Sequence, residues 1–492
     1  MQGKFVRNLS LLLVLNLLIK PFWILGIDRS VQNTVGAEEY GFYFAVFNFS
    51  FLFNILLDFG ITNFNNKNIA QNNHLLTKYL SNLLVLKLLL FLVYIAVTLS
   101  GALFINYSQE QIRLLYFLGL NQFLISMILY LRSNLGGLHL FRTDSIISVL
   151  DRSLMIVICA LLLWGNVVEE FRIQYYIYAQ TAGYSITAVV TFMLVLARTQ
   201  RINFRLQWNY PFLLAIVRKS FPFAILVLLM TFYNRIDSVM LERLLDDGAR
   251  YSGIYASAYR LLDATNMIAY LFAVLLLPIF ARMIKQQENI EHLLKLAFTL
   301  IIAPAIIIAS AAFFYSQEIM ELLYPMHPGE TELAYQYRML ESSRVFGLLM
   351  SCFIAISTTY IFGTLLTANG NLWHLNIIAL SGMMLNITLN FILIPQFQAT
   401  GSAVSSLFTQ LLVAVIQVIA VKRIFRIHVN YSFLMRLLVF VVTIIGINML
   451  WSMLSPFTWL FNIPLVGIAG LLLALALRLL SLRHIYQLMK YA

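Results

Sequence analysis

Long apolar runs recur along almost the whole 492-residue chain, and they constrain its fold more than any other feature. A helix of about 20 apolar residues crosses a bilayer core about 30 Å thick, and about fourteen such runs with few charges can be drawn. Hydrophobic residues make up 61% of the chain and charged residues 11%, against roughly 45–50% and about 25% in soluble globular domains. The sequence therefore predicts an all-α polytopic membrane protein.

The predicted spans are separated by short polar loops. They are residues 9–27, 40–57, 79–105, 112–131, 145–164, 175–197, 221–241, 253–280, 293–315, 341–366, 374–394, 401–421, 436–454 and 461–479. The first run follows Lys4 and Arg7, but it contains Asn16 and Lys20 and lacks a convincing signal-peptidase site. We interpret it as a retained helix.

The loops leave no room for a separate soluble catalytic domain, since the longest are residues 198–220 and 316–340. The Asn-rich stretch at 58–78 is predicted to be a solvated turn. The two cysteines lie inside apolar runs and the seven histidines are widely spaced, so neither a disulfide framework nor a metal site is expected. No Gly-rich phosphate loop is present.

Lys and Arg residues gather in alternate loops of this map. Most of them fall on the side of the N-terminus, a pattern that marks the cytoplasmic face of a membrane protein. We therefore expect both termini in the cytoplasm. The formal net charge of +12 is explained by this topology and by anionic lipid at the inner leaflet, and it does not indicate a nucleic-acid partner.

Two short stretches resemble each other half the chain apart. VGAEEYGFY at residues 35–43 returns as DGARYSGIY at 247–255, and Gly36 and Tyr43 match Gly248 and Tyr255 at one constant offset. An even number of predicted spans separates the copies, which predicts two parallel six-helix lobes followed by two C-terminal helices. The corresponding domains are 1–200, 201–421 and 422–492. A chance match is the alternative, because Gly and Tyr are common at membrane interfaces.

The chain resembles the polysaccharide and oligosaccharide flippase branch of the multidrug, oligosaccharidyl-lipid and polysaccharide exporter superfamily, to which O-antigen repeat-unit flippases belong. The resemblance rests on VGAEEYGFY leading to DFG at 58–60, RID at 235–237, SGIYASAYRLLD at 252–263 and NFILIPQFQATGSAVSS at 390–406. It covers most of the chain, and none of these motifs is a catalytic signature. Fourteen spans fit this branch, whereas the drug exporters of the superfamily look like twelve-helix proteins.

This resemblance implies a two-lobed bundle that moves a lipid-linked sugar from the inner to the outer leaflet of a bacterial cytoplasmic membrane. It implies export or assembly of a surface polysaccharide, such as lipopolysaccharide O-antigen, with membrane lipids and other assembly proteins as partners. It implies no enzyme activity and no cofactor, apart from a coupling ion such as H⁺ or Na⁺.

Ionisable groups deep in a bilayer are costly, so each one is a functional hypothesis. The candidate substrate-binding residues are Asn16, Lys20, Lys87, Arg152, Arg235 and Arg260. Asp237 and Asp263 are candidates for a coupling-ion site or for structural ion pairs with Arg235 and Arg260, and Asp151 is a further acid in the membrane. The surplus of positive charge suits a pyrophosphate between lipid and sugar.

Each candidate also has a structural alternative. Lys87 and Arg152 lie near predicted inner ends, where long cations reach the head groups. Lys20 lies mid-span beside Pro21, which cannot donate to the carbonyl of Leu17 and kinks a helix. Asn16 lies one turn earlier on the same face. These residues therefore predict either a cavity wall or an internal hydrogen bond at the kink.

Other functions remain open at this point. A peptidoglycan-precursor flippase and a drug exporter are alternatives within the superfamily. A membrane-embedded oligosaccharide polymerase or ligase is the enzyme alternative, and it would carry a large outer loop with clustered Arg, His or acidic groups. The predicted outer loop at 316–340 holds such groups but is short.

Overall fold

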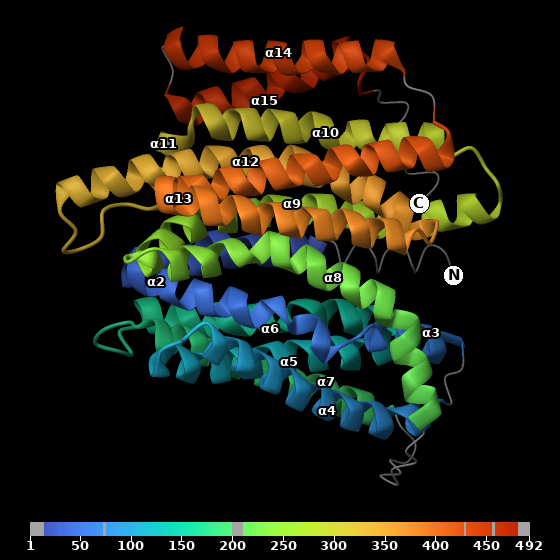
Figure 1. Ribbon diagram of the computed structural model, residues 1–492. Helices are drawn as coiled ribbons and strands as arrows, with labels where there is room; N and C mark the ends of the chain where they lie inside the picture. The colour runs from blue at the N-terminus through green and yellow to red at the C-terminus, as the bar shows by residue number, and fades with distance from the viewer. Residues whose placement is uncertain (1–13, 72–74, 199–209, 428–429, 455–457, 481–492) are drawn as a thin grey trace. The chain divides into compact units, whose positions relative to one another are not determined.

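The computed structural model describes residues 14–71, 75–198, 210–427, 430–454 and 458–480, and within these ranges it contains helices and no strand (Figure 1). Residues 14–22 are helical. The elements that follow are η1 (Trp23–Asp28), α2 (Arg29–Leu52), η2 (Asn54–Leu57), α3 (Ile61–Gln71), α4 (Leu75–Phe104), α5 (Gln109–Gly137), α6 (Phe141–Trp164), α7 (Ile173–Leu196), α8 (Tyr210–Leu244), α9 (Gly248–Lys285), α10 (Glu291–Phe314), α11 (Ser316–Leu323), α12 (Glu332–Ala368), α13 (Leu372–Phe425), α14 (Tyr431–Leu454) and α15 (Trp459–Ala476). The predicted all-α fold class is confirmed.

Eleven of the described helices are long and apolar enough to cross a membrane. One of them, α13, has 54 residues, which at 1.5 Å per residue is about 80 Å, more than twice the bilayer core. Its backbone leaves the helical region at Gln398, where φ is 47° and ψ is −128°. Ser405 Oγ donates to Asn386 O at 3.0 Å, which is possible only where the helix folds back on itself. The part of the chain called α13 therefore holds the two spans predicted at 374–394 and 401–421.

A second turn lies inside α2. Gly36 has φ 82° and ψ 169°, a conformation that is essentially restricted to glycine. It divides the helical chain into a segment that runs from residue 14 through η1 and a segment that runs on to Leu52. These two segments correspond to the first two predicted spans, and the two halves of α13 correspond to two more. The ten other long apolar helices account for the remaining ten of the fourteen predicted spans. The first span continues past its predicted end at residue 27 as far as this glycine.

Residues 61–71 of the Asn-rich stretch form the helix α3, so the prediction of a solvated turn at 58–78 was wrong there. Ile61 and Ile69 of α3 are fully buried and pack in one apolar cluster with Leu131 of α5. Asn65, between them, donates to Ser133 Oγ at 2.8 Å. The polar composition hid an amphipathic helix whose buried face carries two isoleucines and the hydrogen-bonded amide of Asn65.

The chain divides into two compact units, Met1–Val239 and Met240–Ala492. In the first unit, α5 packs against α2, α3 and α7, and α6 packs against α7. In the second, α12 packs against α9, α10 and α13, while α14 and α15 pack on α10. A buried cluster that includes Ile306, Phe440 and Ala474 joins these last three helices. The division lies within α8. The predicted domains at 1–200, 201–421 and 422–492 stay predictions.

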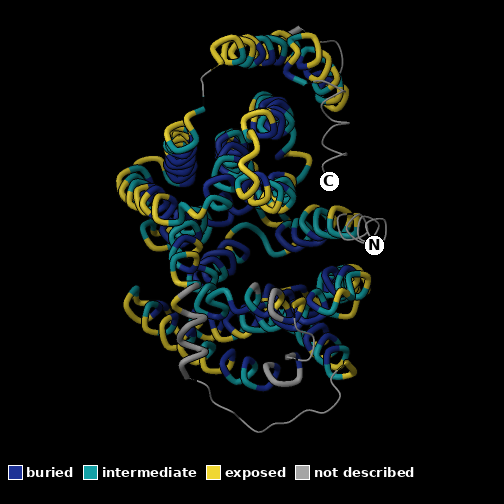
Figure 2. Tube along the Cα trace, turned by 90° about the vertical axis from the view of Figure 1, so that its right-hand side faces the viewer, coloured by how far each residue is buried: buried dark blue, intermediate teal, exposed yellow. Residues whose placement is uncertain are grey.

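Many residues of these helices are exposed, as the colours along the trace in Figure 2 show, and many of the exposed residues are apolar. On α14, for example, Leu434, Leu438, Val442 and Met449 are exposed. In water such a surface would be unfavourable, but in lipid it is the expected one, because only polar groups need partners there. The protein is therefore a multi-pass membrane protein.

The two matching tyrosines of the repeat make corresponding contacts. Tyr43 Oη accepts a hydrogen bond from Gln180 Nε2 of α7 at 3.0 Å. Tyr255 Oη lies 3.3 Å from Ser406 Oγ in the second half of α13. Each tyrosine thus joins the second predicted helix of its lobe to the sixth. This correspondence between distant partners favours a true repeat over a chance match.

Candidate functional site

The first helix loosens at its proline. Directly after Pro21, the residues Trp23–Asp28 form a π-helix. Pro21 has no N–H to donate, and a widened turn is one way for the backbone to continue past such a gap. Single π-helical turns occur frequently at functional sites. The distortion places Trp23 and Asp28 so that both side chains are buried in the first unit.

Three predicted binding residues meet beside this turn. Asn16 donates to Ser148 Oγ of α6 at 3.0 Å. Lys20 lies in the electrostatic field of Arg152, Asp151 and Arg132. The sequence analysis placed Lys20 and Arg152 in separate helices, and the fold brings them together. We call the group Asn16, Lys20, Asp151, Arg152 and Trp23 the cationic cluster.

Aromatic rings surround the arginine of this cluster. The Arg152 guanidinium lies 5.5 Å from the ring centroid of Trp23 and 5.6 Å from that of Tyr184. Trp23 in turn stacks on Tyr176, with centroids 5.7 Å apart and ring planes 8° from parallel. Cations over aromatic faces are stabilised by the ring quadrupole. The cluster therefore holds positive charge against buried aromatic rings.

An acid next to this cluster was missed by the sequence analysis. Asp28 is 2% exposed, and Tyr40 Oη donates to both of its carboxylate oxygens at 2.9 Å. Tyr176 Oη also donates to Asp28. Asp28 directly follows the predicted end of the first span, and the sequence analysis assigned it no role. The sequence signal that could have identified Asp28 is its position one residue beyond an apolar run, with Tyr40 following the turn at Gly36.

Lys87 lies apart from the cationic cluster. Its side chain is fully buried, and its ammonium donates to Asp58 Oδ1 at 2.5 Å, Ser126 Oγ at 2.8 Å and Leu57 O at 3.0 Å. Each of the three N–H groups of the ammonium thus has an acceptor. Lys87, which lies in α4, therefore joins this helix to the end of η2 and to α5. It does not reach toward the head groups, as the alternative interpretation required. A role for Lys87 in substrate binding stays a prediction.

The predicted charges of α8 also lie in the first unit. The Arg235 guanidinium lies 5.3 Å from the ring centroid of Phe51, and Asp237 is 1% exposed. Next to them, Ser238 Oγ accepts a hydrogen bond from Asn48 at 2.8 Å. These contacts connect α8 with α2.

Arg260 and Asp263 belong to the second unit. They lie one turn apart in α9, and both are partly exposed. Their predicted pairing with Arg235 or Asp237 stays a prediction.

The enzyme alternative, a membrane-embedded polymerase or ligase, would depend on the charged groups in and next to the loop before α12. Arg338 donates to Glu330 Oε1 and Oε2 at 2.9 and 2.8 Å and to Pro325 O at 3.0 Å. Burial alone would raise the pKa of Glu330, but hydrogen bonds from Arg338 and from the backbone N–H of His327 lower it. Among the described residues no group of His, Cys, Asp and Glu could hold a metal ion. These contacts hold the loop together.

Comparison with known proteins decides the family. Residues 5–284, more than half of the chain, match the family described as polysaccharide biosynthesis protein. The chain belongs to this family. The resemblance drawn from the sequence motifs is thereby confirmed. No curated protein matches the sequence.

Solved structures share the fold. The lipid II flippase MurJ in an inward closed conformation is 15% identical with a TM-score of 0.71, over 94% of this chain and 98% of that one. An inward-facing multidrug resistance transporter of the MATE family, in the MOP superfamily, is 14% identical with a TM-score of 0.60, over 84% and 96%. The MATE transporter VcmN of Vibrio cholerae is 12% identical with a TM-score of 0.56, over 85% and 96%. At these identities the comparison shows the fold of the polysaccharide family member, and its cargo has to be argued from the site.

Proposed function

We propose that the protein is a transporter, and no enzyme, that flips a lipid-linked oligosaccharide from the inner to the outer leaflet of the bacterial cytoplasmic membrane by alternating access. The cargo is a polyprenyl pyrophosphate that carries the repeat unit of a surface polysaccharide. The observation that carries the proposal is the cationic cluster, which places Lys20 and Arg152 together beside Trp23 and Tyr184 within the membrane-spanning part of the first unit. Membership of a polysaccharide biosynthesis family supports it.

The cluster suits both ends of such a cargo head group. Lys20 and Arg152 offer positive charge to a pyrophosphate, and the planar guanidinium can hold two phosphate oxygens at once. Trp23 and Tyr184 are buried and hold the guanidinium of Arg152 between them. The amide group of Asn16 can hydrogen-bond hydroxyls. A ligand that has two phosphates and a sugar suits this combination of groups.

The energetic argument is the cost of the charges. A lysine or arginine at the centre of a spanning helix costs at least about 2.5–3.5 kcal/mol. Two cations in one cluster also repel each other. An anionic cargo reduces this repulsion when it binds, which favours a ligand that carries phosphate. We propose H⁺ or Na⁺ as the coupling ion, with Asp237 or Asp263 as its site.

The test is transport by Lys20→Ala. In proteoliposomes that contain the purified protein and a polyprenyl-pyrophosphate oligosaccharide, the fraction of cargo exposed to an external glycosidase reports flipping. We expect Lys20→Ala to lower the rate at least about tenfold, which corresponds to about 1.4 kcal/mol of lost interaction, at near-normal abundance. Lys20→Arg should retain much of the rate, and the exposed Lys285→Ala serves as the matched control.

An unchanged rate in Lys20→Ala would remove the cationic cluster from the mechanism. Loss of folded protein instead of transport would assign Lys20 a structural role. Either result leaves the family assignment intact, because that assignment rests on sequence.

A peptidoglycan-precursor flippase is the second candidate, and the shared fold with the lipid II flippase MurJ favours it. Both cargos carry a pyrophosphate between polyprenol and sugar, so the cationic cluster suits either one. The same proteoliposomes, loaded in parallel with lipid II and with a polysaccharide repeat unit on the same polyprenol, separate the two. Faster flipping of lipid II would replace the first proposal by the second.

A further inference from the structure

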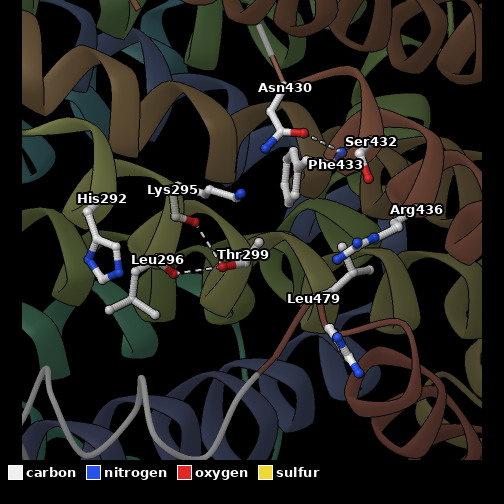
Figure 3. A pocket seen from close by; sticks show the side chains of 10 residues that line it. His292, Lys295, Leu296, Thr299, Asn430, Ser432, Phe433, Arg436 and Leu479 are labelled. Atoms are coloured by element: carbon white, nitrogen blue, oxygen red, sulfur yellow. Dashed lines mark hydrogen bonds between the residues drawn. The ribbon is translucent and has the colours of Figure 1, made fainter. Parts of the chain in front are cut away.

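A small basic cavity lies in the second unit, apart from the charges discussed above. Its volume is about 300 Å³. It lies where the beginning of α10, the beginning of α14 and the end of α15 meet (Figure 3). Its lining residues are His292, Lys295, Leu296, Thr299, Asn430, Ser432, Phe433, Arg436, Arg478 and Leu479. We call it the basic pocket.

Three segments of the second unit each contribute a cation to the basic pocket. Lys295 comes from α10, Arg436 from α14, and Arg478 follows the end of α15. Figure 3 shows the charged ends of Lys295 and Arg436 turned toward the space between their helices. No Asp or Glu is among the lining residues. The nearest acid along α10 is Glu291, one turn before Lys295.

These cations have no acidic partner within the described part of the chain, where no ion pair joins them to a carboxylate. The Lys295 ammonium lies 5.1 Å from the ring centroid of Phe433, whose backbone N–H donates to Asn430 Oδ1 at 3.0 Å. Like charges that share one cavity repel one another. The pocket therefore favours a ligand with negative charge and several hydrogen-bond acceptors.

Apolar surface continues from the pocket along the same helices. Leu438 and Val442 of α14 are 56% and 62% exposed, and Leu472 of α15 is 61% exposed. Lys295 lies within two turns of the start of α10, and Arg436 within two turns of the start of α14. The cations thus lie nearer the helix ends than these exposed apolar side chains do, which suits head groups at the cations and hydrocarbon chains along the apolar surface. A ligand that fits both has a charged head and an apolar tail.

From this arrangement we propose that the basic pocket binds the phosphate head group of an anionic glycerophospholipid, whose acyl chains lie along α14 and α15. Basic pockets between transmembrane helices bind such head groups in other membrane proteins. The phosphate bridges Lys295 of α10 to Arg436 and Arg478. Because α14 and α15 pack on α10, the lipid acts as a clamp that holds these two helices to the rest of the second unit.

The experiment uses the full chain in nanodiscs of phosphatidylcholine with a minor share of phosphatidylglycerol that carries a photoreactive head group. Crosslinked peptides are mapped by mass spectrometry. We expect labelling of peptides that contain Lys295 or Arg436. Each cation near a membrane surface contributes about 1 kcal/mol, or about fivefold, toward an anionic lipid. The variant Lys295→Gln/Arg436→Gln/Arg478→Gln should therefore lose labelling on the order of a hundredfold.

The control removes the same charge elsewhere in the second unit. Lys422, Arg423 and Arg426 are exposed at the end of α13 and do not line the basic pocket. The variant Lys422→Gln/Arg423→Gln/Arg426→Gln should label the pocket peptides as the unchanged protein does. Arg436→Lys keeps the charge and should lose no more than a few-fold, and its labelling decides the matter if the triple pocket variant does not fold.

Four results would overturn the proposal. Equal labelling of both triple variants would show general surface electrostatics only. Displacement of the lipid by inorganic phosphate would show a site for free phosphate. Stronger competition by polyprenyl phosphate than by phosphatidylglycerol would make the pocket part of the cargo path. An Arg436→Lys variant that loses labelling on the order of a hundredfold relative to the unchanged protein would exclude a charge-based site.

Discussion

Replacing Lys87 by methionine tests whether a buried membrane cation serves the fold. The ammonium of Lys87 makes three hydrogen bonds, to Asp58, Ser126 and Leu57 O, and its side chain is 0% exposed. Removing one partner of a buried ion pair costs about 3–5 kcal/mol, because the other charge stays behind. Asp58 is 27% exposed and keeps its bonds from Thr62, so water and these bonds reduce the cost. We expect about 3 kcal/mol, at the lower end of the range.

The assay is the thermal unfolding midpoint of the detergent-solubilised protein, followed by tryptophan fluorescence. In a unit of this size 1 kcal/mol shifts the midpoint by about 2–4 °C, so Lys87→Met should lower it by about 6–12 °C. The double variant Lys87→Met/Asp58→Asn should recover part of the loss, since it removes the stranded carboxylate. Lys20→Met is the matched control, and we expect a shift of less than about 4 °C.

The opposite outcome would refute this reasoning. If Lys87→Met unfolds at the normal temperature and flipping stops, then Lys87 acts on cargo as the sequence analysis predicted, and its hydrogen bonds to Asp58 and Ser126 break during transport. A double variant less stable than Lys87→Met would show that Asp58 stabilises the first unit without the lysine.

Three further predictions concern the turns and the topology. Gly36→Ala forces a side chain into φ 82° and should destabilise by about 1–3 kcal/mol, whereas Gly446→Ala, whose new methyl group meets nothing within 4 Å, should change stability by less than about 1 kcal/mol; equal unfolding midpoints for the two variants would show that Gly36 carries no strain. Because the pKa of Glu330 is lower in the folded loop than in the unfolded chain, its contribution to stability is present above the unfolded pKa and is lost as pH falls through the folded pKa; the midpoint should therefore drop in acid less steeply for Glu330→Gln than for the unchanged protein, and parallel pH profiles would contradict this. Cysteine labelling of intact cells should reach His327→Cys from outside and spare Lys219→Cys, and the reverse pattern would invert the predicted topology.

The membrane spans could be predicted from the sequence because hydropathy is a local property. About twenty apolar residues make a spanning helix whichever helices pack against them. The turn at position 36 is also local, because it depends on the backbone freedom of a single glycine. The repeat was readable for the same reason, since Gly36 and Tyr43 recur in order at one offset. The Asn-rich helix α3 was not, because Ile61 and Ile69 form a buried face only after α5 supplies a surface for it.

The roles of the charged residues depend on partners that are distant in the chain. Lys20 and Lys87 look alike in sequence, each a lone lysine in an apolar run, yet Lys87 meets a carboxylate 29 residues earlier and Lys20 meets the charges of α6. Asp28 is buried by a tyrosine 148 residues later. A charge in a membrane is stable only when matched by another group, and that match depends on which helices pack together. The apolar runs of the sequence therefore determined where the membrane spans lie. Helix packing decided which charges are paired within the fold, such as Lys87, and which lie together beside aromatic rings, such as Lys20 and Arg152.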